Sequence, residues 1–337
     1  MARASKYPKP YVDSKGKPVI RDSYCALIDI LGFAQMIRDG AATGNSNAVF
    51  ESVRHALGQS TDYFKHMRAP SKYFKTPPSW EYKLFTDNLL LGFPKHPNNP
   101  WPDAESEFGS VIQYIVQHQA TLALNGYFSR GGLTYGELHV SNDLAFGVSL
   151  LEAYEIERDI AVFPRIVLGQ SAEKKLIEQL KSYGDFMHAP HNHSLLVDED
   201  GLTFVNYLSE LNPDPGQFYW DELLDHKEWI QQRLEEHQGN NNPLTKYEWL
   251  AAYHNLFCRE WARAYGDIRN VIIRGAPKRN FVLLYKKYQP TRPFIHGAAG
   301  TLYRQQGTGR VVRARKAERE LKLKLEHNKG NESPSAK

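Results

Sequence analysis

In the first two thirds of the chain, short continuous apolar runs alternate with segments in which apolar residues have helical spacing. Residues 24–31 are apolar apart from Asp29, which predicts a buried strand. Across 33–68, apolar residues recur every three or four positions, with glycines and asparagines near 40–47, which predicts a broken helix. Residues 82–93 hold two apolar runs separated by Thr-Asp-Asn, which predicts a β-hairpin with Asp87 at its tip.

The same alternation continues to about residue 210. Helical spacing and strand-like runs predict, in order, a helix over 104–125, a strand over 127–140, a helix over 146–158, a strand over 163–168, a helix over 171–183 and a hairpin over 195–208. The order is β α α β β α β α β α, followed by a hairpin. It predicts an α+β fold of ferredoxin-like order, with helices on a mainly antiparallel sheet.

The pattern changes beyond this region. Long segments with helical spacing of apolar residues, rich in Trp and Tyr, occupy 218–265, and the final segment is basic. We therefore expect an N-terminal arm at 1–22, an α+β domain at 23–210, a mainly helical extension at 211–303 and a basic tail at 304–337.

Composition narrows the class of protein. The 337 residues are 41% hydrophobic and 24% charged, which excludes a mostly disordered chain. Cys25 and Cys258 are too few and too far apart for a zinc motif or a disulfide framework. No apolar stretch approaches the ~20 residues of a membrane span, and the N-terminus lacks the apolar middle of a signal peptide. We expect a cytoplasmic protein with no membrane partner.

The small net charge of +4 does not call for a nucleic-acid partner. Residues 304–329 nevertheless carry nine Lys or Arg against three Glu. We expect this tail to be a solvated helix or chain end, and nucleic-acid binding through it stands as an alternative.

Candidate chemistry gathers around Asp29. The predicted strand ends there, and Gly32 lets the backbone approach a ligand where the helix begins at Phe33. If the hairpin tip lies beside this strand end, Asp29, Asp87 and the carbonyl of Ile30 form an oxygen site for Mg²⁺ or Mn²⁺. Two such ions can activate a hydroxyl and hold a triphosphate.

Four segments, in order, resemble the motifs of class III nucleotidyl cyclases. They are IDILGF at 28–33, KLFTDN at 83–88, RGGLTYGEL at 130–138 and FGVSLLEAYEIE at 146–157. The resemblance covers roughly residues 20–210. It implies a class III cyclase catalytic domain, in which a ribose 3′-hydroxyl attacks its own α-phosphate and yields a cyclic nucleotide and pyrophosphate.

The resemblance also implies roles for single residues. Asp29 and Asp87 would hold two divalent ions, Mn²⁺ or Mg²⁺. The backbone of Ile30, Leu31, Gly32 and Phe33 would bind metal and phosphates. Lys83 matches a lysine that reads the base, whereas the acid that accompanies it in adenylyl cyclases falls on Leu144 here. Active sites in the family form between two subunits, which implies a homodimer.

The transition-state arginine of the family is missing. Family helices carry Asn and Arg at positions that are Leu151 and Glu155 here. Arg158, about a turn further along, is the replacement that we favour, with Arg130 and Arg165 as other candidates; Arg130 is also expected to bind substrate. We expect the acids of this helix to form a charged, solvated face: Glu152, Glu155 and Glu157.

The altered base-reading positions resemble those of the Pycsar pyrimidine cyclases of bacterial anti-phage defence. This implies conversion of UTP, or of CTP, to a cyclic messenger that acts on a separate effector; we favour UTP. The alternatives are an adenylate or guanylate cyclase, and a catalytically degenerate cyclase fold that only binds nucleotide or a partner.

Overall fold

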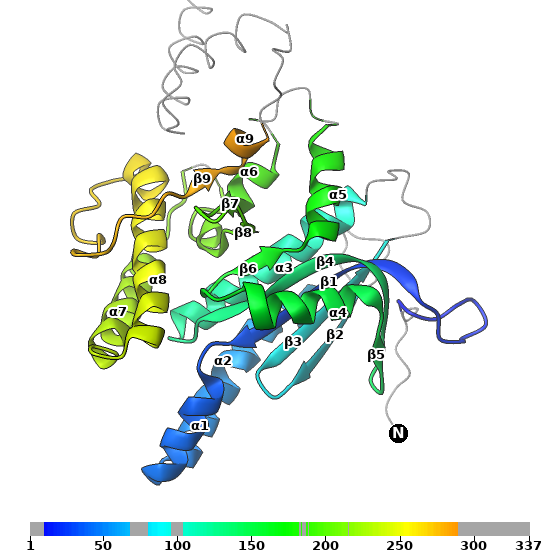
Figure 1. Ribbon diagram of the computed structural model, residues 1–337, viewed down its shortest axis with the longest axis horizontal. Helices are drawn as coiled ribbons and strands as arrows, with labels where there is room; N and C mark the ends of the chain where they lie inside the picture. The colour runs from blue at the N-terminus through cyan, green and yellow to red at the C-terminus, as the bar shows by residue number, and fades with distance from the viewer. Residues whose placement is uncertain are drawn as a thin grey trace, which may run out of the picture.

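The computed structural model describes residues 10–67, 80–95, 104–181, 183, 187, 189–214 and 216–288. The tail at 304–337, residues 1–9 of the N-terminal arm and nearly all of the loop at 69–80 therefore lie outside the described residues. The described chain forms a central sheet with helices on both faces (Figure 1).

Nine strands form this sheet, in the order β2-β3-β1-β4-β6-β8-β7-β9, with β5 paired to β4. Their bounds are β1 Arg21–Ile30, β2 Glu81–Phe85, β3 Asn88–Pro94, β4 Ser129–Val140, β5 Ala145–Phe146, β6 Ile166–Leu168, β7 Leu195–Val197, β8 Thr203–Val205 and β9 Val282–Leu283. All neighbouring pairs are antiparallel except β4 with β6. The α+β fold with a mainly antiparallel sheet is confirmed, and β2-β3-β1-β4 has the ferredoxin-like order.

The helices are α1 Phe33–Ala42, α2 Ser46–Met67, α3 Glu105–Leu124, α4 Val148–Glu155, α5 Gln170–Leu180, α6 His191–Ser194, α7 Trp220–Glu236, α8 Asn241–Glu260 and α9 Leu284–Lys287. The break expected near 40–47 separates α1 from α2. The helix expected at 146–158 begins at Val148 and continues beyond α4 as a π-helical turn, Ile156–Ile160.

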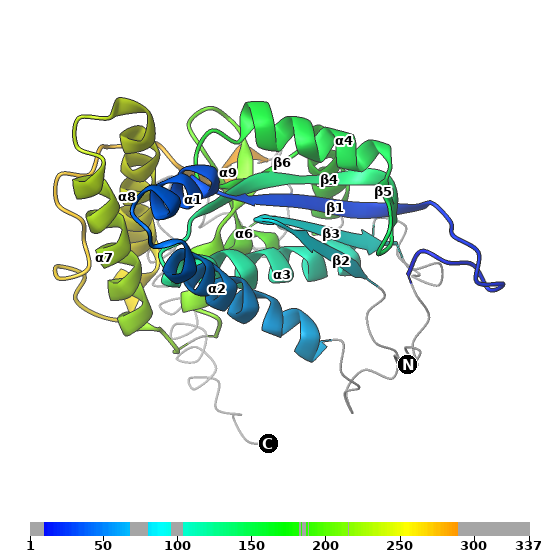
Figure 2. The same cartoon turned by 90° about the horizontal axis from the view of Figure 1, so that it is seen from below.

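Alternation along β1 assigns its side chains to the two faces of the sheet. Tyr24, Ala26 and Ile28 belong to the core shared with α2 and α3, whereas Cys25 and Leu27 belong to the core beneath α4. Figure 2 shows α4 on one face and α2 and α3 on the other. Because side chains alternate with a period of two, Asp29 lies on the same face as Leu27, the face that α4 partly covers.

Glycines in β4 allow α4 to approach the sheet closely. A Cβ at Gly132 would lie 2.9 Å from the carbonyl oxygen of Ala153, and one at Gly131 would lie 2.1 Å from that of Leu27. The close backbone approach expected from this glycine-rich strand is therefore present, and it serves packing of β4 against β1 and α4.

The extension packs on the sheet rather than standing apart from it. α7 and α8 share a second core with β7, β8 and the end of α3, and β9 pairs with β7 (Figure 1). A buried ion network adds to this contact, because Asp198 pairs with Arg165 next to β6 and with Arg279 of the extension. The domain boundary at residue 210 stays a prediction.

In the described part of the chain, every helix is too short or too polar to cross a lipid bilayer.

Candidate functional site

Asp29 and Asp87 meet at one edge of the sheet. Asp29 is the penultimate residue of β1, and Asp87 lies in the two-residue turn between β2 and β3. Because β3 pairs with β1 up to Ile28 and Leu89, the turn reaches the carboxyl end of β1. The two carboxyl groups are close enough to share a hydrogen bond. The structure thus brings together the two acids that the sequence singled out.

The turn that carries Asp87 is strained. Its first residue, Thr86, has a φ of 54°, a left-handed conformation that β-branched residues rarely adopt. Such strain costs of order 1–3 kcal/mol and persists where the surrounding structure imposes it. Here the pairing of Phe85 with Asn88 closes the turn and fixes where Asp87 stands.

Crowding of negative charge changes the chemistry of Asp29. Burial, followed by the hydrogen bond to Asp87 and repulsion from Asp87 and Glu157, raises the pKa of Asp29 to about 8, with Arg130 opposing the shift. Two adjacent carboxylates whose negative charge is not balanced by neighbouring cations suit a divalent cation.

Arg130 lies between Asp29 and a second acid. Its Nε is 3.6 Å from Oδ2 of Asp29, and its Nη2 is 2.6 Å from Oε1 of Glu157. Arg130 pairs with Asp29 across β1 and β4, so their side chains share a face. The site therefore alternates charge, with Asp29, Arg130 and Glu157 in a row.

The prediction that the three glutamates of this helix form a charged, solvated face is wrong for two of them. Glu157 is buried and holds Arg130, and Glu152 accepts hydrogen bonds from the backbone and hydroxyl of Ser171. Only Glu155 is exposed. A signal for Glu157 existed in the spacing, since it lies four residues after Ala153, on the buried face of the helix.

The backbone from Ile30 to Phe33 has the form that the sequence predicts. Gly32 has a φ of 77°, and α1 begins immediately after it without a side-chain cap. The Leu31 N–H donates to the carbonyl of Phe128, 2.8 Å away, which ties this segment to the start of β4. Uncapped N–H groups in the first turn of α1 can donate hydrogen bonds to a phosphate.

Lys83 also lies on the face of Asp29. It pairs with Leu90, which in turn pairs with Leu27, so the three side chains share one side of the sheet. Lys83 is half-buried. Its place is compatible with contact to a substrate bound over this face, and its role as a base reader stays a prediction.

The other two arginines lie apart from these acids. Arg158 is exposed, pairs with Asp159 at 2.6 Å and lies over the ring of Tyr154. Arg165 is fully buried, and its guanidinium pairs with Asp198 and Asp200. Arg165 therefore belongs to the ion network that binds the extension, and Arg158 does not contact Asp29 or Asp87 within the described chain.

A lysine of the extension, missed in the sequence, lies near Arg130. Burial, and then repulsion from Arg130, lowers the pKa of Lys246 in α8. The next residue, Tyr247, contacts the ring of Phe128, at a centroid distance of 6.1 Å. Among the described residues, none forms an ion pair with Lys246. No motif could reveal it, because only tertiary packing brings α8 to this strand end.

The donor set fits a hard divalent ion only with help from the backbone or a ligand. Among the described residues, no group of three or more His, Cys, Asp or Glu side chains could hold a metal. Two carboxylates and the Ile30 carbonyl offer oxygen alone, which favours Mg²⁺ or Mn²⁺ over zinc. Phosphate oxygens of a substrate would complete the coordination.

Comparison with known proteins finds a weak structural likeness but no matching family. No protein-family model matches the chain, and no curated protein matches it. Among solved structures, the chain is similar to the crystal structure of a class III adenylyl cyclase-like ATP-binding protein from Pseudomonas aeruginosa, at 11% identity and a TM-score of 0.35. The match covers 50% of this chain and 38% of that one, so the chain spans well under half the length of that protein. So slight a likeness carries no argument about function.

Proposed function

We propose that this protein is a nucleotide cyclase that converts a pyrimidine nucleoside triphosphate, UTP above CTP, to its 3′,5′-cyclic monophosphate and pyrophosphate. The observation that carries the proposal is the meeting of the Asp29 and Asp87 carboxyl groups at the end of β1. Both lie in segments that resemble class III cyclase motifs, within strands of the expected order.

Asp29, Asp87 and the carbonyl of Ile30 would hold two Mg²⁺ or Mn²⁺ ions. When bound, such ions lower the pKa of a hydroxyl and neutralise phosphate charge. Asp29 must give up its proton to bind one, because burial and neighbouring acids keep it protonated near neutral pH. Ion binding should therefore release a proton from this carboxyl group.

Three further groups would bind the triphosphate. The N–H groups at the start of α1 lie directly after the metal-binding strand end. Arg130, oriented by Glu157, and Lys246 of α8 add positive charge on the same side of the molecule. In this proposal they supply the charge that Glu155 cannot, since it stands where the family has an arginine.

A second copy of the chain would complete the site. Large apolar side chains are exposed along β5, α4 and the segment after it: Leu144, Phe146, Val148, Leu151, Tyr154, Ile160 and Val162. Leu84 and Phe85 of the hairpin are exposed as well. An apolar face of this kind marks an interaction surface. Arg158 is exposed beside it, where it could reach the site of a partner subunit.

Pyrimidine choice and a role in anti-phage signalling rest on the resemblance alone, through Lys83 and the loss of the acid at Leu144. In that role, the cyclic product acts on a separate effector protein. An adenylate or guanylate cyclase is the enzymatic alternative. A degenerate, nucleotide-binding protein is favoured only by Leu151 and Glu155.

Product analysis tests the proposal. The purified chain is incubated with Mn²⁺ and ATP, GTP, CTP or UTP separately, and products are identified by mass spectrometry. We expect a cyclic pyrimidine nucleotide that Asp87→Ala abolishes. A cyclic purine would keep the chemistry and reject the pyrimidine assignment, and no product from any of the four would favour the degenerate binding protein.

A further inference from the structure

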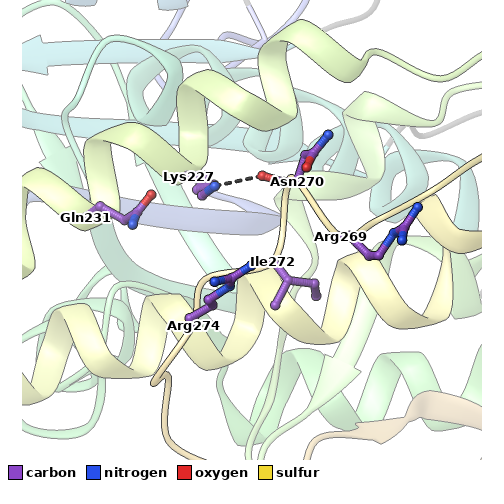
Figure 3. A pocket seen from close by; sticks show the side chains of 6 residues that line it. All are labelled: Lys227, Gln231, Arg269, Asn270, Ile272 and Arg274. Atoms are coloured by element: carbon purple, nitrogen blue, oxygen red, sulfur yellow. Dashed lines mark hydrogen bonds between the residues drawn. The ribbon is translucent and has the colours of Figure 1, made fainter.

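A second concave site lies on the extension, between α7 and the loop at 267–274. It has a volume of about 210 Å³. Figure 3 shows Lys227 and Gln231 on α7, facing a loop that carries the remaining lining residues. These are Arg269, Asn270, Ile272 and Arg274.

Buried polar side chains of α8 hold the backbone of this loop. The Nε2 of His254 lies 2.8 Å from the carbonyl oxygen of Val271 and donates to it. Asn255 donates to the carbonyl of Ile273 and accepts from its N–H, at 2.8 and 2.9 Å. Both side chains are buried. These hydrogen bonds hold the backbone of the loop in place, so its outward side chains project from defined positions.

The lining of the cavity is positively charged. Three of its six residues are cations, Lys227, Arg269 and Arg274, and none is an acid. Lys227 donates to the carbonyl of Asn270 at 2.7 Å, an uncharged acceptor (Figure 3). Asp267 pairs with Arg269 at 2.6 Å and offsets one charge. Within the described residues, Arg274 has no ion-pair partner.

We propose that this cavity binds the phosphate group of a small anion, such as pyrophosphate or a nucleoside phosphate. Arg274 and Lys227 supply charge, and the amides of Gln231 and Asn270 supply further donors. A guanidinium offers paired N–H groups that match phosphate oxygens.

Size and surroundings favour a small ligand over a nucleic acid. The cavity of about 210 Å³ has room for a small anion, so the rest of a much longer ligand would project into solvent. The helix on one side of it is rich in acids, which would repel a long polyanion: Asp221, Glu222, Asp225, Glu228, Glu235 and Glu236. The site shares no residue with the candidate catalytic centre, so it stands or falls independently of the proposed function.

The test is calorimetric titration of the full chain with inorganic pyrophosphate in the presence of a chelator, which removes metal-dependent binding at Asp29 and Asp87. Arg274→Gln should raise Kd about tenfold or more, because a charge-assisted hydrogen bond is lost. Arg54→Gln is the matched control, since Arg54 is an exposed arginine on α2. Thermal melting checks that both variants are folded.

Saturable binding that Arg274→Gln weakens and Arg54→Gln leaves unchanged would support the proposal. No binding at millimolar pyrophosphate, or equal binding by Arg274→Gln and the parent chain, would overturn it. A parallel titration uses a single-stranded RNA oligonucleotide. RNA binding much tighter than pyrophosphate binding, and dependent on Arg274, would replace the small anion with a nucleic acid and so reject the proposal.

Discussion

At the scale of single residues, the central feature is a carboxyl group that is protonated where most aspartates are charged. Asp29 has a pKa of about 8 in the folded chain, against an unfolded value near 4. Between these pH values the folded state holds a proton that the unfolded state has lost. The free energy of unfolding of the metal-free chain should therefore fall as pH rises from about 4 to about 8.

Asp29→Asn should remove this contribution, because an amide does not titrate. We expect the variant to gain stability relative to the parent chain, by roughly 1–2 kcal/mol at pH 8 and much less at pH 5, since water still reaches the carboxylate. Urea unfolding in a chelator measures this. A difference in stability that is the same at both pH values would contradict the raised pKa, and exposed Asp39 provides the control substitution, Asp39→Asn.

Glu157 is the second residue whose role can be tested. It is buried and holds Arg130 beside Asp29. We expect Glu157→Gln to lower kcat about tenfold, because Arg130 loses its charged partner and its orientation. Glu155→Gln, on the exposed side of the same helix, should have little effect. Equal activity of the two variants would show that Glu157 does not position Arg130.

At the scale of elements, much of the order of helices and strands can be predicted from the sequence, because the apolar period of each element is a local property of the chain. The strand at β1, the break between α1 and α2, and the hairpin with Asp87 in its turn all follow from apolar spacing and turn residues. The pairing of β1 with β3 is not local, so the meeting of Asp29 with Asp87 was only an expectation until the register placed it.

The predictions that failed concern charged side chains whose burial depends on partners from other elements. Glu152 and Glu157 looked like a solvated face because they are charged, yet the helix turns them toward β4 and α5. Lys246 could not be found at all, because it reaches the site from a helix outside every motif. Tertiary packing, not propensity, decides such positions.

Packing of α4 against β4 gives a prediction for this element. Gly132→Ala places a Cβ 2.9 Å from the backbone carbonyl of Ala153, which cannot move without displacing the helix. We expect a loss of about 1–3 kcal/mol in unfolding free energy, together with reduced activity. Gly58→Ala in α2 is the control, because its Cβ would meet no atom within 4 Å. There, alanine should stabilise by about 0.5–1 kcal/mol. Chemical denaturation of both variants compares them, and a neutral Gly132→Ala would contradict the close approach.

At the scale of the whole molecule, one sheet carries both the candidate site and the extension. β9 joins the edge at β7, and Asp198 links Arg165 with Arg279. The extension thereby has a fixed relation to β4, which places Lys246 near Arg130.

Assembly is the prediction at this scale. Leu151 is 63% exposed on α4, within the apolar face described above. Leu151→Glu should convert a dimer to a monomer and abolish turnover, because charge buried in an apolar interface is costly. Phe50→Glu, at an exposed apolar residue of α2, on the other side of the sheet from α4, should leave both properties unchanged. Analytical ultracentrifugation reports the mass, and a parent chain that is monomeric at all concentrations would exclude the dimer.

The most direct measurement is Mn²⁺ binding by electron paramagnetic resonance, with the parent chain compared to Asp29→Asn, Asp87→Asn and the control Asp39→Asn. The account predicts that each of the first two variants weakens binding at least tenfold and that the control does not, because Asp29 and Asp87 together hold the ion. Binding that survives both substitutions, or is absent from the parent chain even with a nucleoside triphosphate present, would contradict a metal site at this sheet edge.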